Sequence, residues 1–209
     1  MFFNELSKRK QVRWYDENRI PDLSLIQDAL QQTHEAVAAK QNLMPYKIYV
    51  VANNKQLNEG MYDLSKGGTG TVTANTNLLT APYQFIYTAR LVTDASEKVQ
   101  SDMAMGHIQP PCDPEMYKNP INSQGVCIEI GMHCTILSKI LIEQGIDVSY
   151  TRCFDMWQHN KELWNKKGLS FVEDDVYLLM SAGYADPDPN IYYEARETKP
   201  PFDNIVKYC

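Results

Sequence analysis

Two arginines near the start of the chain have a spacing that suits ligand binding. Arg9 and Arg13 are four positions apart, so they share one face if this segment is helical. A guanidinium group can hold a phosphate through two parallel hydrogen bonds. The same basic run also includes Lys8 and Lys10, and it would equally well form a solvated surface. The spacing alone leaves both interpretations open.

Histidine, cysteine and glycine patterns predict no other reactive centre. The four histidines lack metal-ligand spacing, and the five cysteines form an odd set without a CxxC pair, so neither a metal site nor a disulfide framework is expected. Cys153 has no acid–base partner nearby in the sequence. The glycine-rich stretch 67–71 lacks the ending of a phosphate-binding loop, and we interpret it as a flexible loop. Cys127 and Cys134 lie in an apolar run and are expected to be buried, and His133 in the same run is interpreted as structural.

Hydrophobic periodicity predicts the elements that would position these residues. Apolar residues recur at helical spacing in 22–39, with Pro21 suited to its first turn, and again in 123–144. The second of these helices also carries apolar groups outside its main face, such as Ile128, so we expect it to be buried on several sides. A polar, amphipathic helix is predicted over 155–167. Strands are predicted over 47–51, 83–88, 148–151 and 176–182.

Two segments without periodicity complete the chain. Four prolines exclude a regular helix over 105–122, which is predicted to be a proline-rich surface loop or lid. Residues 186–209 form a C-terminal tail that must pack on something else, and a partner subunit is one physically reasonable place. Helices interleaved with a few strands predict an α+β fold, and we treat 1–209 as a single domain.

Composition narrows the class of protein. Of the 209 residues, 44% are hydrophobic and 22% are charged, as in an ordinary globular domain. The net charge of -6 disfavours general nucleic-acid binding, which needs a surplus of Lys and Arg. No stretch approaches the roughly 20 apolar residues that span a bilayer, and the N-terminus turns charged too soon for a secretory signal. We therefore expect a cytoplasmic protein that binds neither nucleic acid nor a membrane.

The order of several short motifs resembles the nitroreductase family. Each motif is weak alone, but together they follow the family's order along nearly the whole chain. They start with a basic opening and an Asn-containing turn before the first strand, and they end with a basic C-terminal signature. The segments are Arg9–Tyr15, Asn42–Tyr46, Leu78–Pro82, Glu143–Asp147, Arg152–Asp155, Ser181–Tyr184 and Lys199–Val206.

This resemblance implies a fold, a cofactor and an assembly. It implies a mixed, mainly antiparallel sheet flanked by helices, in a homodimer with the central helix at its interface. Each of two FMN sites would be built from both chains, and the 186–209 tail would extend over the partner. NADH or NADPH would reduce the flavin, and an electron-poor acceptor such as a nitroaromatic or a quinone would then be reduced. No catalytic side chain is required, because the cofactor carries the chemistry.

The resemblance also assigns cations to the flavin. Arg9 would face the phosphate, and Arg13 would lie near the N1/O2 edge, where a cation stabilises the charge that develops on reduction. Gln11, in place of the family's usual serine, would hydrogen-bond the flavin. Lys199, with Arg196 in support, would supply the second phosphate cation.

Amides and backbone groups would complete the implied site. Asn42 and Asn77 are candidates for the ring and the ribityl group, although an isolated Asn is as often a turn residue. Backbone N–H groups around Arg152 and Cys153 would meet flavin N5 and O4. Two departures from the family leave substrate and reductant preference open: the stretch 38–42 lacks the small hydroxyls that usually line the second subunit's side of the pocket, and Arg152-Cys153 replaces a frequent Glu-Gly pair.

Other functions stay open at this stage. The same pocket could serve a specialised reaction, such as dehalogenation, flavin breakdown or dehydrogenation of a bound substrate. The chain could also bind flavin without catalysis. A nucleic-acid protein using the basic run 8–13 is a further alternative, which the net charge opposes.

Overall fold

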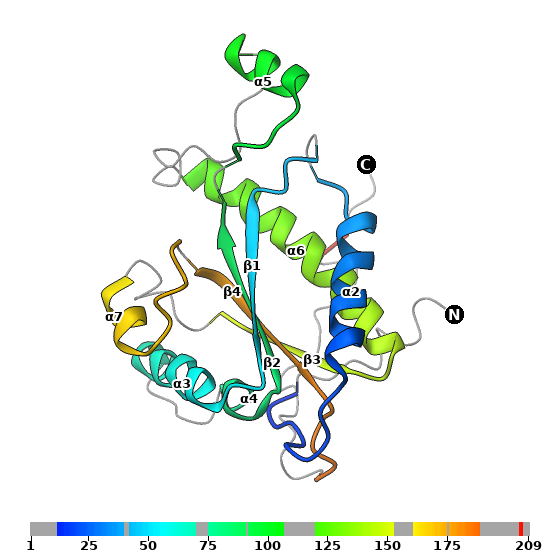
Figure 1. Ribbon diagram of the computed structural model, residues 1–209, viewed down its shortest axis with the longest axis vertical. Helices are drawn as coiled ribbons and strands as arrows, with labels where there is room; N and C mark the ends of the chain where they lie inside the picture. Colours follow the sequence, from blue (N-terminus) through cyan, green and yellow to red (C-terminus); the bar gives the residue numbers. More distant parts are fainter. Residues whose placement is uncertain are drawn as a thin grey trace.

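The computed structural model describes residues 12–39, 42–69, 75–90, 92–106, 120–152, 161–174, 176–188 and 205–206. Its centre is a four-stranded sheet in the order β1-β2-β4-β3, and every described pairing is antiparallel. The four predicted strands are confirmed to within two residues at each end. They are β1 (Tyr46–Ala52), β2 (Tyr83–Ala89), β3 (Asp147–Thr151) and β4 (Val176–Gly183). Helices lie on both sides of this sheet, which confirms the α+β fold (Figure 1).

One face of the sheet is covered by two helices, α2 (Leu23–Ala36) and α6 (Pro120–Glu143). Successive side chains of a strand point to opposite faces, and Phe85 and Tyr87 of β2 point to this one. The apolar face that the sequence predicted for α6 forms much of the core here. Its residues are Val126, Ile130, Cys134, Leu137 and Leu141, all of them buried.

The opposite face packs against α3 (Lys55–Thr69), α4 (Asn77–Thr80) and α7 (Lys161–Lys166). Neither α3 nor α4 was predicted. The loop interpretation of 67–71 is wrong for residues 67–69, which belong to α3; residues 70–71 lie outside the described part. The glycines of α3 hide its helical pattern, and Gly60 has a packing reason, because a Cβ there would lie 2.7 Å from the carbonyl oxygen of Lys167.

Several predicted boundaries need correction. The first predicted helix ends at Ala36 rather than residue 39, and Pro21 lies before the N-cap residue Asp22 instead of inside the first turn. Of the predicted loop 105–122, residues 120–122 belong to α6, where Pro120 is tolerated because the first N–H groups of a helix have no helical partner. An unpredicted short helix, α5 (Glu97–Ala104), precedes it and stands apart from the sheet (Figure 1).

Helix α6 is long and strongly apolar. From Gly125 to Glu143 its mean hydropathy is 1.6, enough by length and composition alone to cross a membrane, although the sequence predicted no stretch of this kind. In this structure 44% of that stretch is buried, as in a core helix. The expectation of burial on several sides is wrong for the single chain, because Ile128 is 63% exposed. Cys134 is buried as expected, whereas Cys127 is exposed, contrary to expectation.

Candidate functional site

Arg13 lies in a non-helical segment that is fixed to α4 by two hydrogen bonds. The Thr76 hydroxyl donates to the Arg13 carbonyl oxygen at 2.9 Å. The backbone N–H of Tyr15 donates to Thr80 Oγ1 at 3.0 Å. Because residues 12–14 are not helical, the shared helix face considered for Arg9 and Arg13 does not extend to Arg13. Its position is set instead by hydroxyl groups at the start and end of α4.

Asn77, the next residue after Thr76, connects α4 to the sheet. It is fully buried, and its side-chain amide donates to Thr151 Oγ1 at 3.1 Å and to Ser181 Oγ at 2.9 Å. Its Oδ1 has no hydrogen-bond partner among the described residues. Ser181 in turn donates to Gln84 Oε1 at 2.7 Å. In this conformation Asn77 holds α4 against β3 and β4, and its role as a flavin ligand stays a prediction.

The end of β3 places Arg152 close to the same junction. Thr151, which accepts from Asn77, is the last residue of β3, and the exposed Arg152 follows it directly. A hydrogen bond connects Arg13 to Thr76, and another connects Asn77 to Thr151. Thr76 and Asn77 are neighbours in the sequence, as are Thr151 and Arg152. The structure thus brings three of the predicted site residues, Arg13, Asn77 and Arg152, to one region.

The sheet face beneath this junction is polar. Ser149 and Thr151 are two positions apart and point to the same side of β3, opposite to Val148, which packs in the core under α6. The Tyr15 hydroxyl reaches Ser149 Oγ at 2.9 Å and donates to the Ser181 carbonyl oxygen at 3.1 Å. Sequence reasoning missed this network, although hydroxyl residues at every second position of a strand are a signal that could have pointed to it.

Asn42 lies before β1, the edge strand of the sheet opposite to β3. It is exposed, has a φ of 56° and begins the turn that leads into β1 at Tyr46. Asn is among the residues that adopt such a φ most readily, which fits the turn interpretation. Tyr46 pairs with Ala89, six residues along β2 from Tyr83, so this turn is about 20 Å from the Tyr15 end of the sheet. Within one chain Asn42 does not join the other predicted site residues.

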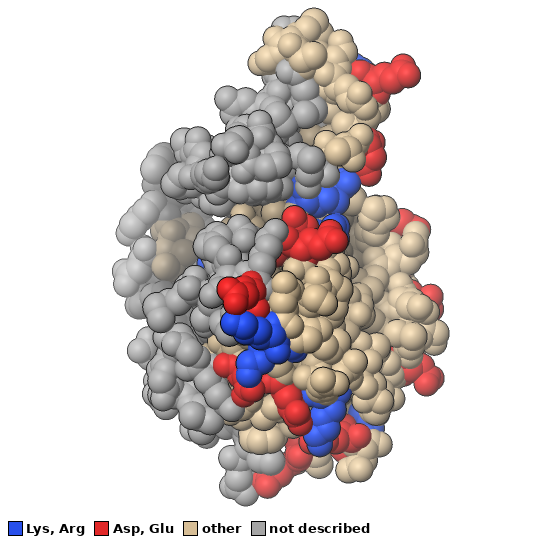
Figure 2. All heavy atoms as spheres, turned by 60° about the vertical axis from the view of Figure 1, so that its left-hand side comes forward, with Lys and Arg blue, Asp and Glu red and all other residues tan. Residues whose placement is uncertain are grey.

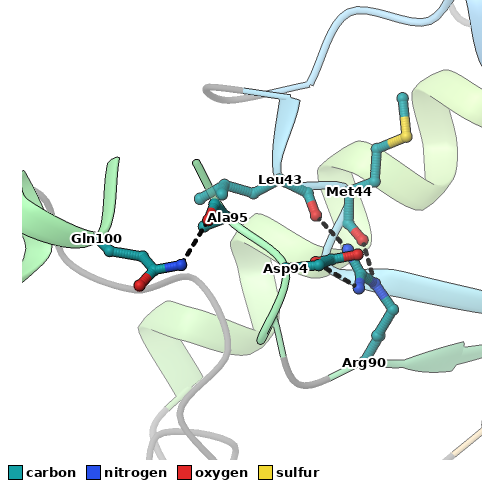
Figure 3. Close-up of polar contacts among 6 residues, drawn as sticks. All are labelled: Leu43, Met44, Arg90, Asp94, Ala95 and Gln100. Atoms are coloured by element: carbon teal, nitrogen blue, oxygen red, sulfur yellow. Dashed lines mark hydrogen bonds and ion pairs between the residues drawn. The ribbon is translucent and has the colours of Figure 1, made fainter. Parts of the chain in front are cut away.

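Arg90 fixes the turn that contains Asn42, and sequence reasoning missed it. Its guanidinium donates from Nη2 to the Leu43 carbonyl oxygen at 2.7 Å and from Nε to the Met44 carbonyl oxygen at 3.1 Å. Nη1 also forms an ion pair with Asp94 at 2.9 Å, and this hydrogen bond lowers the pKa of the carboxyl. Figure 3 shows the guanidinium between the turn and Asp94.

His133 has the structural role that the sequence suggested. It is buried on α6, and its Nδ1 lies 3.0 Å from the Tyr87 hydroxyl. Burial, and then the nearby His34, lower the pKa of His133 to about 4. The imidazole is therefore neutral near pH 7.

Other predicted site residues lie outside the described part of the chain. These are Arg9, Gln11, Cys153, Arg196 and Lys199, and most of the 186–209 tail. Among the described residues no group of three or more His, Cys, Asp or Glu side chains is arranged to hold a metal ion. In the view of Figure 2, the described surface carries Lys and Arg next to Asp and Glu, so charges of both signs are mixed there.

Solved structures of nitroreductase-like proteins share this architecture. A nitroreductase-like protein from Streptococcus mutans aligns over 100% of this chain and 98% of its own, with a TM-score of 0.68 and 17% identity. A candidate nitroreductase from Exiguobacterium sibiricum, solved in complex with FMN, aligns over 100% and 97%, with a TM-score of 0.69 and 16% identity. A candidate NAD(P)H:FMN oxidoreductase from Staphylococcus epidermidis aligns over 100% and 96%, with a TM-score of 0.67 and 16% identity. No protein-family model matches the sequence, and no curated protein is significantly similar to it.

These likenesses define the class of protein by its fold. The chain is an α+β protein with an antiparallel sheet between two helical layers. More particularly, it has the nitroreductase fold over its whole length, as the order of its sequence motifs predicted.

Proposed function

We propose that this protein is an FMN-dependent oxidoreductase that takes electrons from NADH or NADPH and passes them to an electron-poor acceptor such as a nitroaromatic or a quinone. The observation that carries the proposal is the junction of Arg13, Asn77 and Arg152, which lies over the polar sheet face described above. A phosphorylated cofactor needs cations. This junction brings the chain at Arg13 close to the chain at Arg152, while the side-chain N–H groups of Asn77 are bonded to Thr151 and Ser181 within the protein. The fold shared with an FMN complex supports the same reading.

The residues of the chain would bind and orient the cofactor. Bound FMN supplies the redox chemistry, as an acceptor and donor of electrons, and the protein supplies position and charge. Arg13 would stand near the flavin edge that becomes negative on reduction, with Arg9, Lys199 and Arg196 at the phosphate. Gln11, and the backbone N–H groups at Arg152 and Cys153, would bind other polar edges.

The proposed site is shared between two copies of the chain. Asn42 precedes β1 and Arg152 follows β3, the two opposite edge strands of the sheet, so Asn42 can contribute to the same site only if a partner subunit brings it there. The exposed face of α6 supports such a partner, because Ile128 and Met132 are 63% and 39% exposed beside Gly131 and Ile136 around a cavity of about 410 Å³. Apolar surface of this kind is typical of subunit interfaces.

The visible spectrum of the purified protein tests the proposal. We expect absorption bands of bound oxidised flavin, which NADH or NADPH bleaches when oxygen is excluded, and which return when a quinone is added. Bound flavin that neither nucleotide reduces would favour a specialised reaction or flavin binding without turnover. A folded protein that takes up no FMN from an excess would contradict the proposal. Cytoplasmic location and the single domain over 1–209 stay predictions from the sequence.

A further inference from the structure

We propose that a pocket between α2, β1 and α6 binds an uncharged, largely apolar molecule that carries a hydrogen-bond acceptor such as a carbonyl group. The pocket has a volume of about 520 Å³, within the range of small-molecule sites. It lies on the face of the sheet that α2 and α6 cover, whereas the junction of Arg13, Asn77 and Arg152 lies on the opposite face. The pocket is therefore on the other side of the sheet from Arg13, Asn77 and Arg152, and its Met44 belongs to the turn that begins at Asn42.

The lining of the pocket is apolar where it meets the core. Leu30 of α2, Met44 and Ile48 line it, and all three pack against the main hydrophobic cluster. Gln27 and Gln31 are exposed on the adjoining side of α2. A ligand with a flat or compact apolar body would displace water from Leu30, Met44 and Ile48. Its polar end would contact the polar residues of the lining.

One polar group of the lining has no hydrogen-bond partner in the part of the chain that the structure describes. The hydroxyl of Tyr46 is buried and makes no hydrogen bond with a described residue. Burial, followed by the charge of Glu129, raises the pKa of Tyr46 to about 12, so the hydroxyl keeps its proton and can donate. Buried hydroxyls are normally hydrogen-bonded, and an acceptor on a bound molecule would supply what the protein does not.

The charges around the pocket favour a neutral ligand. Arg90 lines it, but its guanidinium already donates hydrogen bonds to two backbone carbonyl oxygens. It also forms an ion pair with Asp94, which balances its charge. Asp94 also lines the pocket, so the acidic and basic groups Asp94 and Arg90 of the lining are the two members of one ion pair. His133 is neutral near pH 7 and adds a ring that can hydrogen-bond without charge.

The pocket is held in shape before any ligand arrives. Arg90 fixes the Leu43–Met44 turn by two hydrogen bonds, and Figure 3 shows this arrangement just beyond the end of β2. The ring of Tyr46 packs edge-on against His133 at a centroid distance of 5.2 Å, and the Tyr87 hydroxyl lies 3.0 Å from His133 Nδ1. A site built from fixed groups loses little conformational freedom on binding.

Titration with 2-naphthamide tests the inference on both flavin-loaded and flavin-free protein. Saturation-transfer NMR should show binding of this uncharged probe, at least about tenfold tighter than 2-naphthoate or 2-naphthylmethylammonium, because Arg90 and Asp94 of the lining already neutralise each other and a charged probe would lose hydration on entry. Gln27→Trp should block the pocket and weaken binding at least about tenfold, whereas Gln32→Trp, on the same helix but outside the lining, should not.

Tyr46→Phe separates a ligand-binding hydroxyl from a structural one. Because the hydroxyl has no hydrogen-bond partner among the described residues, its removal should not lower the thermal unfolding midpoint, yet it should weaken 2-naphthamide binding about tenfold. Absence of binding, equal binding by Gln27→Trp, or unchanged affinity of Tyr46→Phe would each overturn the proposal. Displacement of FMN by the probe, one molecule for one, would show instead that the pocket belongs to the flavin site.

Discussion

Arg13 is held in place by neighbours that do not depend on its charge, which makes it suitable for substitution. Its carbonyl oxygen accepts from Thr76, and Tyr15 anchors the segment two residues later. Arg13→Ala should therefore leave the fold intact and weaken FMN binding about tenfold or more, because a hydrogen bond to a charged group disappears. Equilibrium dialysis against FMN measures the effect. Arg19→Ala, an exposed arginine on the same segment, is the matched control, and equal affinities for the two variants would count against the role of Arg13.

His133 predicts how stability depends on pH. Its pKa is about 4 in the folded protein, below the ordinary value of about 6.5, so between these values the unfolded chain binds more protons. The stability that the neutral, buried imidazole provides is complete above about pH 6.5 and is lost as the pH falls towards 4. Urea unfolding should show a loss of roughly 2 kcal/mol between pH 7 and pH 5 from this group.

The matched test uses two histidines of different burial. His133→Gln should remove most of that loss, since the new side chain does not titrate. His34→Gln, at an exposed position, should leave most of it in place. If the pH dependence is the same in the wild type and in His133→Gln, then His133 is not its source.

At the level of elements, Arg90 joins the end of β2 to the turn before β1. Arg90→Met removes hydrogen bonds to two carbonyl groups, which should lower the free energy of unfolding by about 1–3 kcal/mol and speed hydrogen exchange at the start of β1. Asp94→Ala removes only the exposed ion pair and should cost less than about 1 kcal/mol. Hydrogen-exchange mass spectrometry and urea unfolding check both variants. Equal effects would mean that the ion pair, and not the turn, is what Arg90 stabilises.

The elements that the sequence predicted well are those with one clear periodicity. The strands and the main face of α6 alternate or repeat strongly, so side-chain pattern alone locates them. Helix α3 was missed because Gly60, Gly67 and Gly68 weaken its pattern, although Gly60 is required by the approach of Lys167. The Asn77 network and the Arg90 turn join residues far apart in the chain, and local pattern carries no information about such contacts.

For the whole molecule, the dimer proposed above would explain both the exposed apolar face of α6 and the position of Asn42. Ile128→Glu places a charge in that face, and burying an unpaired charge is costly, so the variant should be monomeric where the wild type is a dimer. If each flavin site needs both chains, FMN should be lost together with the dimer. Light scattering after gel filtration, with flavin absorbance recorded on the same peak, measures both. Ile20→Glu, at an exposed isoleucine outside α6, should remain dimeric and yellow, and a monomeric wild type that holds one FMN per chain would rule out a shared site.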